Sequence, residues 1–307
     1  MIGGRKVIDG HLHTKYFPEN WFIECADKRG YDGYAVLSLS CMKSWGGEKN
    51  NEQCLAAKRA DPKRCYLFSG LVHPCEDYKA HVENWLKEGA DGIKLIETKP
   101  TVQKETGVDL SDEKFDEMFS YLEETGTPIL WHCGDPATFW NGDKVPDWAV
   151  ENGWFYGDGS YKSLPELYGM VEKVLQKHPK LWVCLAHLYF CGDDRKHAED
   201  LLDTYQNVRL DITPGVEMYD SFTEDHDGWH DFFMKYQDRI QLGSDTDMGN
   251  DLNAENAFNL AYKALGKVEF DWNQMHVKGL DLPEPVIDKV VYKNFRAFAG
   301  ETPKGIG

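Results

Sequence analysis

Basic residues are scarce in this chain. It has 34 lysines and arginines against 52 aspartates and glutamates in 307 residues, which leaves a net charge of −18. A strongly acidic protein repels the phosphates of nucleic acids and the anionic headgroups of membranes. We therefore expect neither nucleic acid nor a membrane as a partner. A small-molecule substrate remains compatible, because the local charge of a site can differ from the net charge.

The cysteines show no pattern of pairing. Eight are scattered between Cys25 and Cys191, and none form a C-x-x-C motif. Disulfide-stabilised secreted proteins are usually shorter and denser in cysteine. Scattered reduced thiols are typical of the cytoplasm, where we expect this protein to work.

Long apolar runs are absent as well. No stretch approaches the roughly 18 apolar residues that a membrane-spanning helix needs. Residues 1–6 contain no apolar core of a signal peptide, so we expect none. No Gly-x-Gly-x-x-Gly turn follows an early strand, which argues against a dinucleotide-binding fold.

The chain does contain a regular alternation of short apolar runs with helical patterns. Eight runs are rich in β-forming residues and apolar on both faces, as buried parallel strands should be. They cover residues 6–9, 34–39, 65–72, 92–96, 128–131, 181–186, 208–212 and 240–243. The helical patterns cover residues 19–28, 52–60, 77–87, 112–124, 164–177, 194–205, 227–235, 255–265 and 285–298.

This alternation predicts an α/β fold with a parallel sheet and right-handed crossovers. Eight units fit a (β/α)8 TIM barrel with an extra C-terminal helix better than a doubly wound sheet. No linker divides the chain, so we expect a single domain over residues 1–307. A long aromatic loop, residues 133–162, follows the fifth strand. We expect it to form a lid or pocket wall, although it could instead pack on the barrel or a partner subunit.

The first strand ends in two histidines, His11 and His13. Alternate residues of a strand share a face, so both imidazoles point the same way. Two imidazoles at a strand end can hold one metal ion, because the backbone keeps their separation constant. Two exposed polar residues after a strand are the alternative, and further ligands decide between the two interpretations.

Polar side chains also stand at the carboxyl ends of later predicted strands. They are His73, Lys94, Glu97, His132, His187, Asp211 and Asp245. The carboxyl ends of barrel strands meet on one face, where active sites form. Several imidazoles and a carboxylate on that face suit Zn²⁺ or a similar divalent ion with one position open to water.

Six motifs occur in the order typical of a known family. They are Val-Ile-Asp-Gly-His-Leu-His, Gly-Ile-Lys-Leu, Pro-Ile-Leu-Trp-His, Cys-Leu-Ala-His-Leu, Val-Arg-Leu-Asp-Ile and Ile-Gln-Leu-Gly-Ser-Asp. The set resembles the amidohydrolase superfamily, and most of all its amidohydrolase 2 (amidohydrolase-related) branch of metal-dependent hydrolases, lactonases and nonoxidative decarboxylases. The closing Val-Tyr-Lys-Asn-Phe-Arg-Ala-Phe-Ala-Gly is similar to the last helix of that branch.

The resemblance implies roles for individual residues. His11, His13, His132 and Asp245 would bind the metal ion, and Asp245 would also handle a proton. His187 would act on substrate or water in a one-metal enzyme, and would bind the second ion in a two-metal enzyme.

Lys94 has three interpretations. The resemblance to two-metal relatives implies a carboxylated lysine that bridges two ions. A free amine in the site could instead bind a substrate carboxylate as a point charge. A structural ion pair is the third.

Three functions are compatible with these residues. The first is metal-dependent hydrolysis of an amide, ester or lactone carbonyl in a small molecule, with Asp245, His187 and Lys94 as catalytic residues. The second is nonoxidative decarboxylation of an aromatic or unsaturated carboxylic acid, and the third is a non-catalytic metal-binding protein. We expect three further residues to bind substrate: His73, Trp154 and Tyr156.

The expected cofactor is one divalent ion, Zn²⁺ in the first place. The same nitrogen and oxygen ligands accept Mn²⁺ or Fe²⁺, and a second ion is possible if His187 and Lys94 are ligands. Barrels of this branch are commonly dimers or larger, so the resemblance also implies a homo-oligomer.

Overall fold

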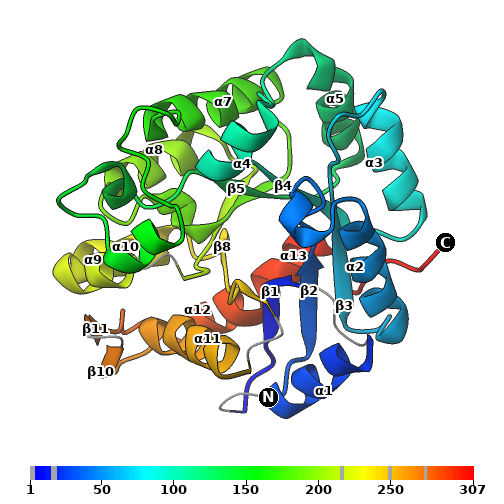
Figure 1. Ribbon diagram of the computed structural model, residues 1–307. Helices are drawn as coiled ribbons and strands as arrows, with labels where there is room; N and C mark the ends of the chain where they lie inside the picture. The colour runs from blue at the N-terminus through cyan, green and yellow to red at the C-terminus, as the bar shows by residue number, and fades with distance from the viewer. Residues whose placement is uncertain (1–3, 15–18, 215–217, 248–250, 273–274) are drawn as a thin grey trace.

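The structure is a computed structural model that describes residues 4–14, 19–214, 218–247, 251–272 and 275–307 (Figure 1). Its centre is a parallel sheet in the order β8-β7-β6-β5-β4-β3-β2-β1-β9. The strands are β1 (Ile8–His13), β2 (Gly33–Leu37), β3 (Cys65–Gly70), β4 (Gly92–Thr98), β5 (Ile129–Cys133), β6 (Val183–Leu185), β7 (Val208–Asp211), β8 (Ile240–Gln241) and β9 (Thr246–Asp247).

The last strand nearly closes the barrel against the first. β8 and β9 are two pieces of one strand, interrupted at residues 242–245, and β9 pairs with β1. Within the interruption, Gly10 N donates to Leu242 O at 3.0 Å and Asp245 N donates to His11 O at 2.8 Å. Eight parallel strand positions therefore form a ring, which confirms the predicted (β/α)8 TIM barrel.

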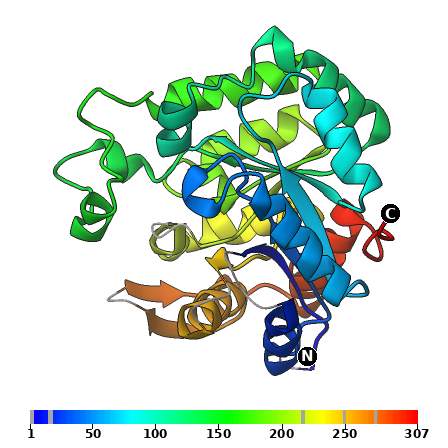
Figure 2. The same cartoon turned by 45° about the vertical axis from the view of Figure 1, so that its right-hand side comes forward.

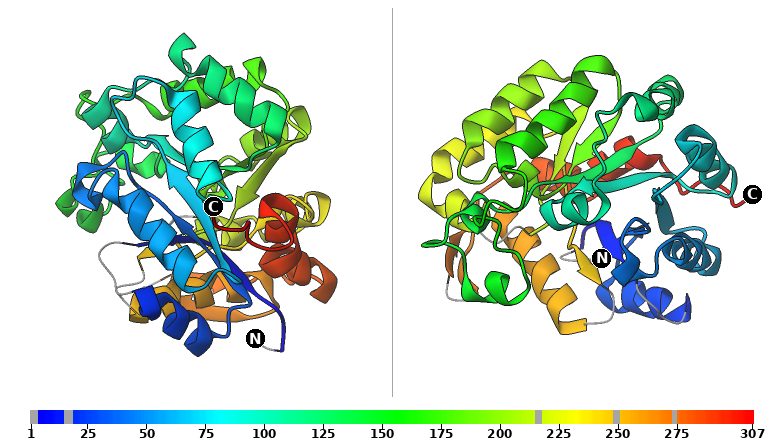
Figure 3. Two further views of the ribbon diagram at one scale, coloured as in Figure 1. Left: turned by 90° about the vertical axis from the view of Figure 1, so that its right-hand side faces the viewer. Right: turned by 45° about the horizontal axis from the view of Figure 1, so that its top comes forward.

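Helices lie outside the strands in both views of Figure 3. They are α1 (Glu19–Arg29), α2 (Lys49–Ala60), α3 (Tyr78–Lys87), α4 (Pro100–Thr106), α5 (Asp116–Thr125), α6 (Asp147–Glu151), α7 (Leu164–Lys177), α8 (Arg195–Thr204), α9 (Met218–Glu224), α10 (His226–Lys235) and α11 (Asp251–Leu265). Every predicted helix has a counterpart, whereas the short helices α4, α6 and α9 were not predicted. Among the described residues, none of the helices is long and apolar enough to cross a membrane.

The extra C-terminal helix plugs one end of the barrel. It consists of α12 (Glu284–Asp288), a π-helical turn, η5 (Lys289–Lys293), and α13 (Asn294–Ala299). Phe295 and Phe298 of α13 belong to one buried cluster with strand side chains such as Ile8 and Phe68. The rings of Phe68 and Phe298 stack with their centroids 6.0 Å apart. This apolar plug leaves the carboxyl ends of the strands as the polar end of the barrel.

The loop after β5 is held together by its own aromatic side chains. It contains a 3-10 turn, η3 (Ala137–Trp140), and α6. Phe139 and Tyr156 are buried in a small cluster against which Trp154 packs. Figure 2 shows this segment extending from the barrel on the same side as the hairpin of β10 (Glu269–Trp272) and β11 (Met275–Lys278). The sequence predicted the long loop but not the hairpin.

Candidate active site

β1 carries the histidine pair, and a bulge precedes the second half of the strand. Between Asp9 and Leu12, β1 has one residue more than its partner β2. An extra residue shifts the alternation of the side chains that follow, and bulges often aim a side chain into a site. His11 and His13 are both buried at the polar end of the barrel.

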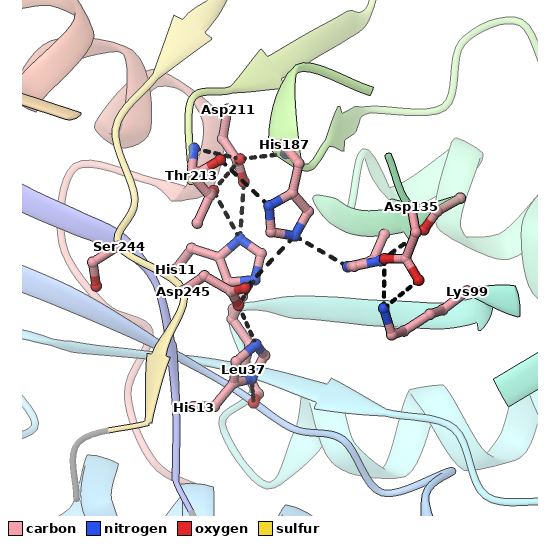
Figure 4. A network of polar contacts seen from close by, with 12 residues as sticks. His11, His13, Leu37, Lys99, Asp135, His187, Asp211, Thr213, Ser244 and Asp245 are labelled. Carbon is pink, nitrogen blue, oxygen red and sulfur yellow. Dashed lines mark hydrogen bonds and ion pairs between the residues drawn. The ribbon is translucent and has the colours of Figure 1, made fainter. Parts of the chain in front are cut away.

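Three side chains, those of His11, His13 and Asp245, form a compact group of potential metal ligands, the ligand group. One ligand atom each from His11, His13 and Asp245 lies within 4.8 Å of the others. Oδ1 of Asp245 is 3.0 Å from Nε2 of His13 and 3.3 Å from Nε2 of His11. Asp245 reaches this position from the interruption in the last strand, with a left-handed backbone φ of 55°. Figure 4 shows the three side chains converging.

Each histidine of this group is oriented by a second partner. His11 Nδ1 lies 3.0 Å from Oδ2 of the buried Asp211, and His13 Nδ1 lies 2.8 Å from the carbonyl oxygen of Leu37. These contacts leave the Nε2 atoms to face Asp245. Histidine ligands of metals usually have such an acceptor on their second nitrogen. The donor set and its orientation therefore fit a divalent ion held by His11, His13 and Asp245.

The protonation of the group suits a cation. Burial, and after it the charge of Lys94, lower the pKa of His11 to about 3. Burial alone would raise the pKa of Asp245, but the hydrogen bond from His13 and the nearby His187 and His11 hold that pKa well below its ordinary value. Metal ions bind neutral imidazoles and ionised carboxylates, and these are the forms favoured for His11 and Asp245.

His132 and His187 lie beside the group and contact each other. His187 Nε2 is 3.1 Å from Nδ1 of His132 and 3.8 Å from Oδ2 of Asp245. Burial lowers the pKa of both imidazoles to about 4. His132 contacts His187, and His187 in turn faces Asp245 of the ligand group. Its assignment as a fourth ligand stays a prediction, and so does the role of His187.

A left-handed turn carries His187. His187, Leu188, Tyr189 and Phe190 have φ angles of 57°, 53°, 58° and 51°. This conformation costs an L-residue roughly 1–2 kcal/mol, and such strain concentrates at functional sites. The ring of Phe190 stacks on the His187 ring at 4.9 Å, and the backbone N–H of His187 donates to Asp211 Oδ1 at 2.8 Å. No glycine marks this turn in the sequence.

Lys94 lies inside the site. Its side chain is buried, and Nζ is 3.3 Å from Nε2 of His11. Burial lowers the pKa of this amine to about 8. The structure thus brings Lys94 to the ligand group, while its carboxylation stays a prediction.

Two charged residues that the sequence analysis passed over stand next to His132. Asp135 follows β5 and accepts hydrogen bonds from Lys99 Nζ at 2.5 and 2.6 Å and from the Tyr156 hydroxyl at 2.6 Å. Oδ1 of Asp135 is 3.5 Å from Nε2 of His132. Lys99 and Asp135 follow β4 and β5, so the search for polar residues at strand ends, extended by two residues, would have found them.

A cavity of about 710 Å³ borders the ligand group and reaches Lys99. His13, His132 and Asp245 line it on one side, and Lys99 lines another part of the wall. The rest of the wall is rich in aromatic rings, contributed by Trp45, Trp148, Trp154 and Trp272. The cavity is large enough for a small organic molecule and offers it flat apolar surfaces.

The predicted substrate-binding residues occupy different places. Trp154 lines the cavity. Tyr156 is buried, and its hydroxyl donates a hydrogen bond to Asp135. His73 Nε2 is 2.8 Å from Oε1 of the buried Glu97, in a separate contact. Neither His73 nor Tyr156 is among the described residues that line the cavity, so of the three only Trp154 is placed to touch a ligand there.

Comparison with known families gives a match over most of the chain. Residues 42–298 match the amidohydrolase family model Amidohydro_2. The matched span includes His132, His187 and Asp245 and begins after the two histidines of β1. No curated protein matches the chain.

Solved structures with several activities share the fold. A 5-carboxyvanillate decarboxylase from Novosphingobium aromaticivorans, crystallised with manganese and 4-hydroxy-3-methoxy-5-nitrobenzoic acid, is 13% identical with a TM-score of 0.60, covering 97% of this chain and 96% of that one. A 4-oxalomesaconate hydratase from Rhodopseudomonas palustris is 14% identical with a TM-score of 0.56, covering 95% of each chain. A candidate 2-pyrone-4,6-dicarboxylic acid hydrolase from Pseudomonas putida is 12% identical with a TM-score of 0.57, covering 95% of this chain and 97% of that one.

At these identities, the likeness to solved structures shows the fold and leaves the reaction undetermined. The family match covers most of the chain and includes the site residues His132, His187 and Asp245. The chain therefore belongs to the amidohydrolase family.

Proposed function

We propose that this protein is a metal-dependent hydrolase that directs water at a carbonyl of a small molecule. The observation that carries the proposal is the position of the Asp245 carboxylate. Its Oδ1 lies with the imidazoles of His11 and His13, and its Oδ2 turns toward His187 at 3.8 Å. One oxygen can thus take part in metal binding while the other accepts a proton.

Two residues of the chain would carry out the proton transfer and stabilise the oxyanion. A divalent ion bound by the ligand group would lower the pKa of water toward about 7 and polarise a carbonyl. Asp245 accepts the proton of the attacking water and returns it to the leaving group. His187 donates a hydrogen bond to the developing oxyanion, and the stacked Phe190 keeps its ring in position.

The metal assignment is also part of this proposal. His11, His13 and Asp245 would hold the ion, with His132 as a further ligand. Zn²⁺ is the first candidate for this donor set, and Mn²⁺ and Fe²⁺ suit it too. The amidohydrolase match favours an enzyme over a non-catalytic metal-binding protein.

Nonoxidative decarboxylation is a second candidate, because the cavity wall is rich in aromatic rings. Four tryptophans face the space beside the ligand group. Such rings can stack on a planar aromatic acid. The Novosphingobium aromaticivorans relative, crystallised with manganese and a nitrobenzoic acid, is named for this reaction. In this alternative, Asp245 or His187 would protonate the carbon that loses CO₂.

One assay distinguishes the two reactions. The protein loaded with Zn²⁺ or Mn²⁺ is incubated with a panel of lactones, aryl esters, anilides and hydroxybenzoic acids, and both CO₂ release and acid release are measured. Hydrolysis predicts acid release without CO₂, and decarboxylation predicts CO₂.

Variants make the assay specific to the site. Asp245→Asn should reduce either activity by at least about 100-fold, since one acid–base group contributes typically 10²–10⁴-fold. Asp231→Asn, on the exposed side of α10, is the matched control and should retain full activity. Retention of activity by Asp245→Asn would contradict both reactions as described.

A further inference from the structure

The cavity wall carries one cation. Among the cavity-lining residues that the structure describes, Lys99 is the only lysine or arginine. Its side chain is 13% exposed, and the ammonium lies 5.1 Å from the centroid of the Trp154 ring. The charge therefore stands at a mostly enclosed surface beside a flat ring, where a ligand can meet both.

Lys99 is held in this position by a buried partner. Asp135 is 3% exposed and takes the Lys99 ammonium with both carboxylate oxygens, at 2.5 and 2.6 Å. Burial by itself would raise the pKa of Asp135, but Lys99 and His132 lower it to about 2. The Tyr156 hydroxyl, from the long loop, donates to the same carboxylate. The ammonium therefore loses little freedom when it binds a ligand.

The Lys99 ammonium has one N–H donor that Asp135 does not use. An ammonium has three N–H donors, and Asp135 accepts two of them. For the described part of the chain, Asp135 is the only hydrogen-bond partner of Nζ. The third N–H is thus available to an acceptor in the cavity that Lys99 lines.

The lysine is also close to the reacting groups. Asp135 is 3.5 Å from Nε2 of His132, and His132 is 3.1 Å from His187. Figure 4 shows Lys99 and Asp135 beside the histidines. A single small molecule can therefore contact the ligand group and Lys99 together.

We propose that Lys99 binds a second anionic group of the substrate, a carboxylate or phenolate, while the reacting group of the same molecule lies at His11, His13 and Asp245. This inference rests on the proposed function and adds a substrate class to it, namely a planar small molecule with two separate anionic groups. Trp154 packs on the molecule next to its second group. Asp135 and Tyr156 are positioning residues, since they act through Lys99.

Binding of simple aromatic acids tests the proposal. The Mn²⁺-loaded protein is titrated by calorimetry with benzoate and with the 1,2-, 1,3- and 1,4-benzenedicarboxylates. At least one dicarboxylate should bind about 10-fold or more tightly than benzoate, as expected for one charge-assisted hydrogen bond. The double variant Lys99→Met/Asp135→Asn should lose this preference, so that its affinities for benzoate and for the dicarboxylate become about equal.

The double variant is chosen because Lys99→Met alone would leave the buried Asp135 carboxylate without its charge partner. Lys104→Met is the matched control: this lysine lies on α4, near Lys99 in the chain, and bonds Ser160 instead of facing the cavity. It should keep the preference for the dicarboxylate.

Each outcome decides the proposal. The role of Lys99 would be overturned if benzoate and all three dicarboxylates bound equally. It would also be overturned if the double variant kept the preference for a dicarboxylate. Neither result would by itself contradict the proposed metal site. Benzoate binding that is abolished by His13→Ala would still support the metal site in those cases. If neither benzoate nor any dicarboxylate binds the Mn²⁺-loaded protein, the role of Lys99 and the proposed small-acid site both fail.

Discussion

At the scale of single residues, the site consists of functional groups that other side chains hold in place. Asp211 makes the most such contacts: Oδ2 faces His11 Nδ1, and Oδ1 accepts from the backbone N–H groups of His187 and Thr213. Burial would raise the pKa of Asp211, but His11 lowers it below its ordinary value. One ionised carboxylate thereby orients two of the site histidines.

Replacing Asp211 tests this orienting role. In Asp211→Asn the side chain keeps its size but loses its charge, so His11 loses its anionic acceptor. We expect the affinity for Zn²⁺ to fall about 10–100-fold, as for other second partners of metal-bound histidines. Competition with a chromogenic chelator measures the affinity.

Asp227→Asn serves as the control for that measurement, because Asp227 lies on the surface, away from the site. It should bind Zn²⁺ like the unchanged protein. A folded Asp211→Asn protein with unchanged affinity would show that Asp211 does not orient a metal-bound His11.

At the scale of elements, the bulge in β1 depends on glycine. A Cβ on Gly10 would lie 2.7 Å from Cδ2 of Phe295 and 2.8 Å from the carbonyl oxygen of Leu242. The strand therefore passes between the C-terminal helix and the last strand at a distance that only glycine permits. This close approach links the apolar plug of the barrel to the position of the next residue, His11.

Gly10→Ala should accordingly destabilise the protein by about 1–3 kcal/mol, the usual cost of overpacking a core. Urea unfolding followed by circular dichroism measures the change. Gly169→Ala in α7 is the matched control: a Cβ there meets nothing within 4 Å, and alanine should leave stability unchanged or raise it by up to about 1 kcal/mol. Equal stability of the two variants would be inconsistent with the crowding at Gly10.

At the scale of the whole molecule, the acidic chain buries five histidines among its described residues, four of them in the site and one, His178, outside it. His178 ends α7, is 5% exposed and packs on Phe119 with the ring centroids 5.8 Å apart. Burial lowers its pKa, an effect that the nearby Glu123 only partly offsets. In the described part of the chain, its Nε2 has no hydrogen-bond partner.

His178 should make folding sensitive to acid. Because its pKa is lower in the folded state, the unfolded chain binds a proton more readily, and stability falls as the pH drops below the ordinary histidine value of about 6.5. In His178→Asn, the free energy of unfolding should fall less steeply between about pH 6.5 and 5. Urea titrations at a series of pH values measure this slope.

The exposed His276→Asn is the control for the pH series and should follow the unchanged protein, since its side chain is 60% exposed. An identical slope for His178→Asn and the unchanged protein would show that His178 does not contribute to the acid sensitivity.

The sequence by itself determined the barrel and most of the polar end. Strand periodicity is a local property, so eight apolar runs and the helices between them were visible without coordinates. The rule that parallel strands end on one face then gathered His11, His13, Lys94, His187 and Asp245, and the structure places them together.

Only the tertiary structure decided how these groups face one another. The bulge in β1 is a mismatch between two strands, and the left-handed turn at His187 has no glycine to signal it. The contact of Asp135 with Lys99 and Tyr156 joins the end of β4 to two distant parts of the loop after β5. Such features depend on register and on packing between distant residues, which no local pattern encodes. For the same reason, the sequence did not point to Lys99, which lines the cavity, while substrate binding by His73 and Tyr156 stays a prediction.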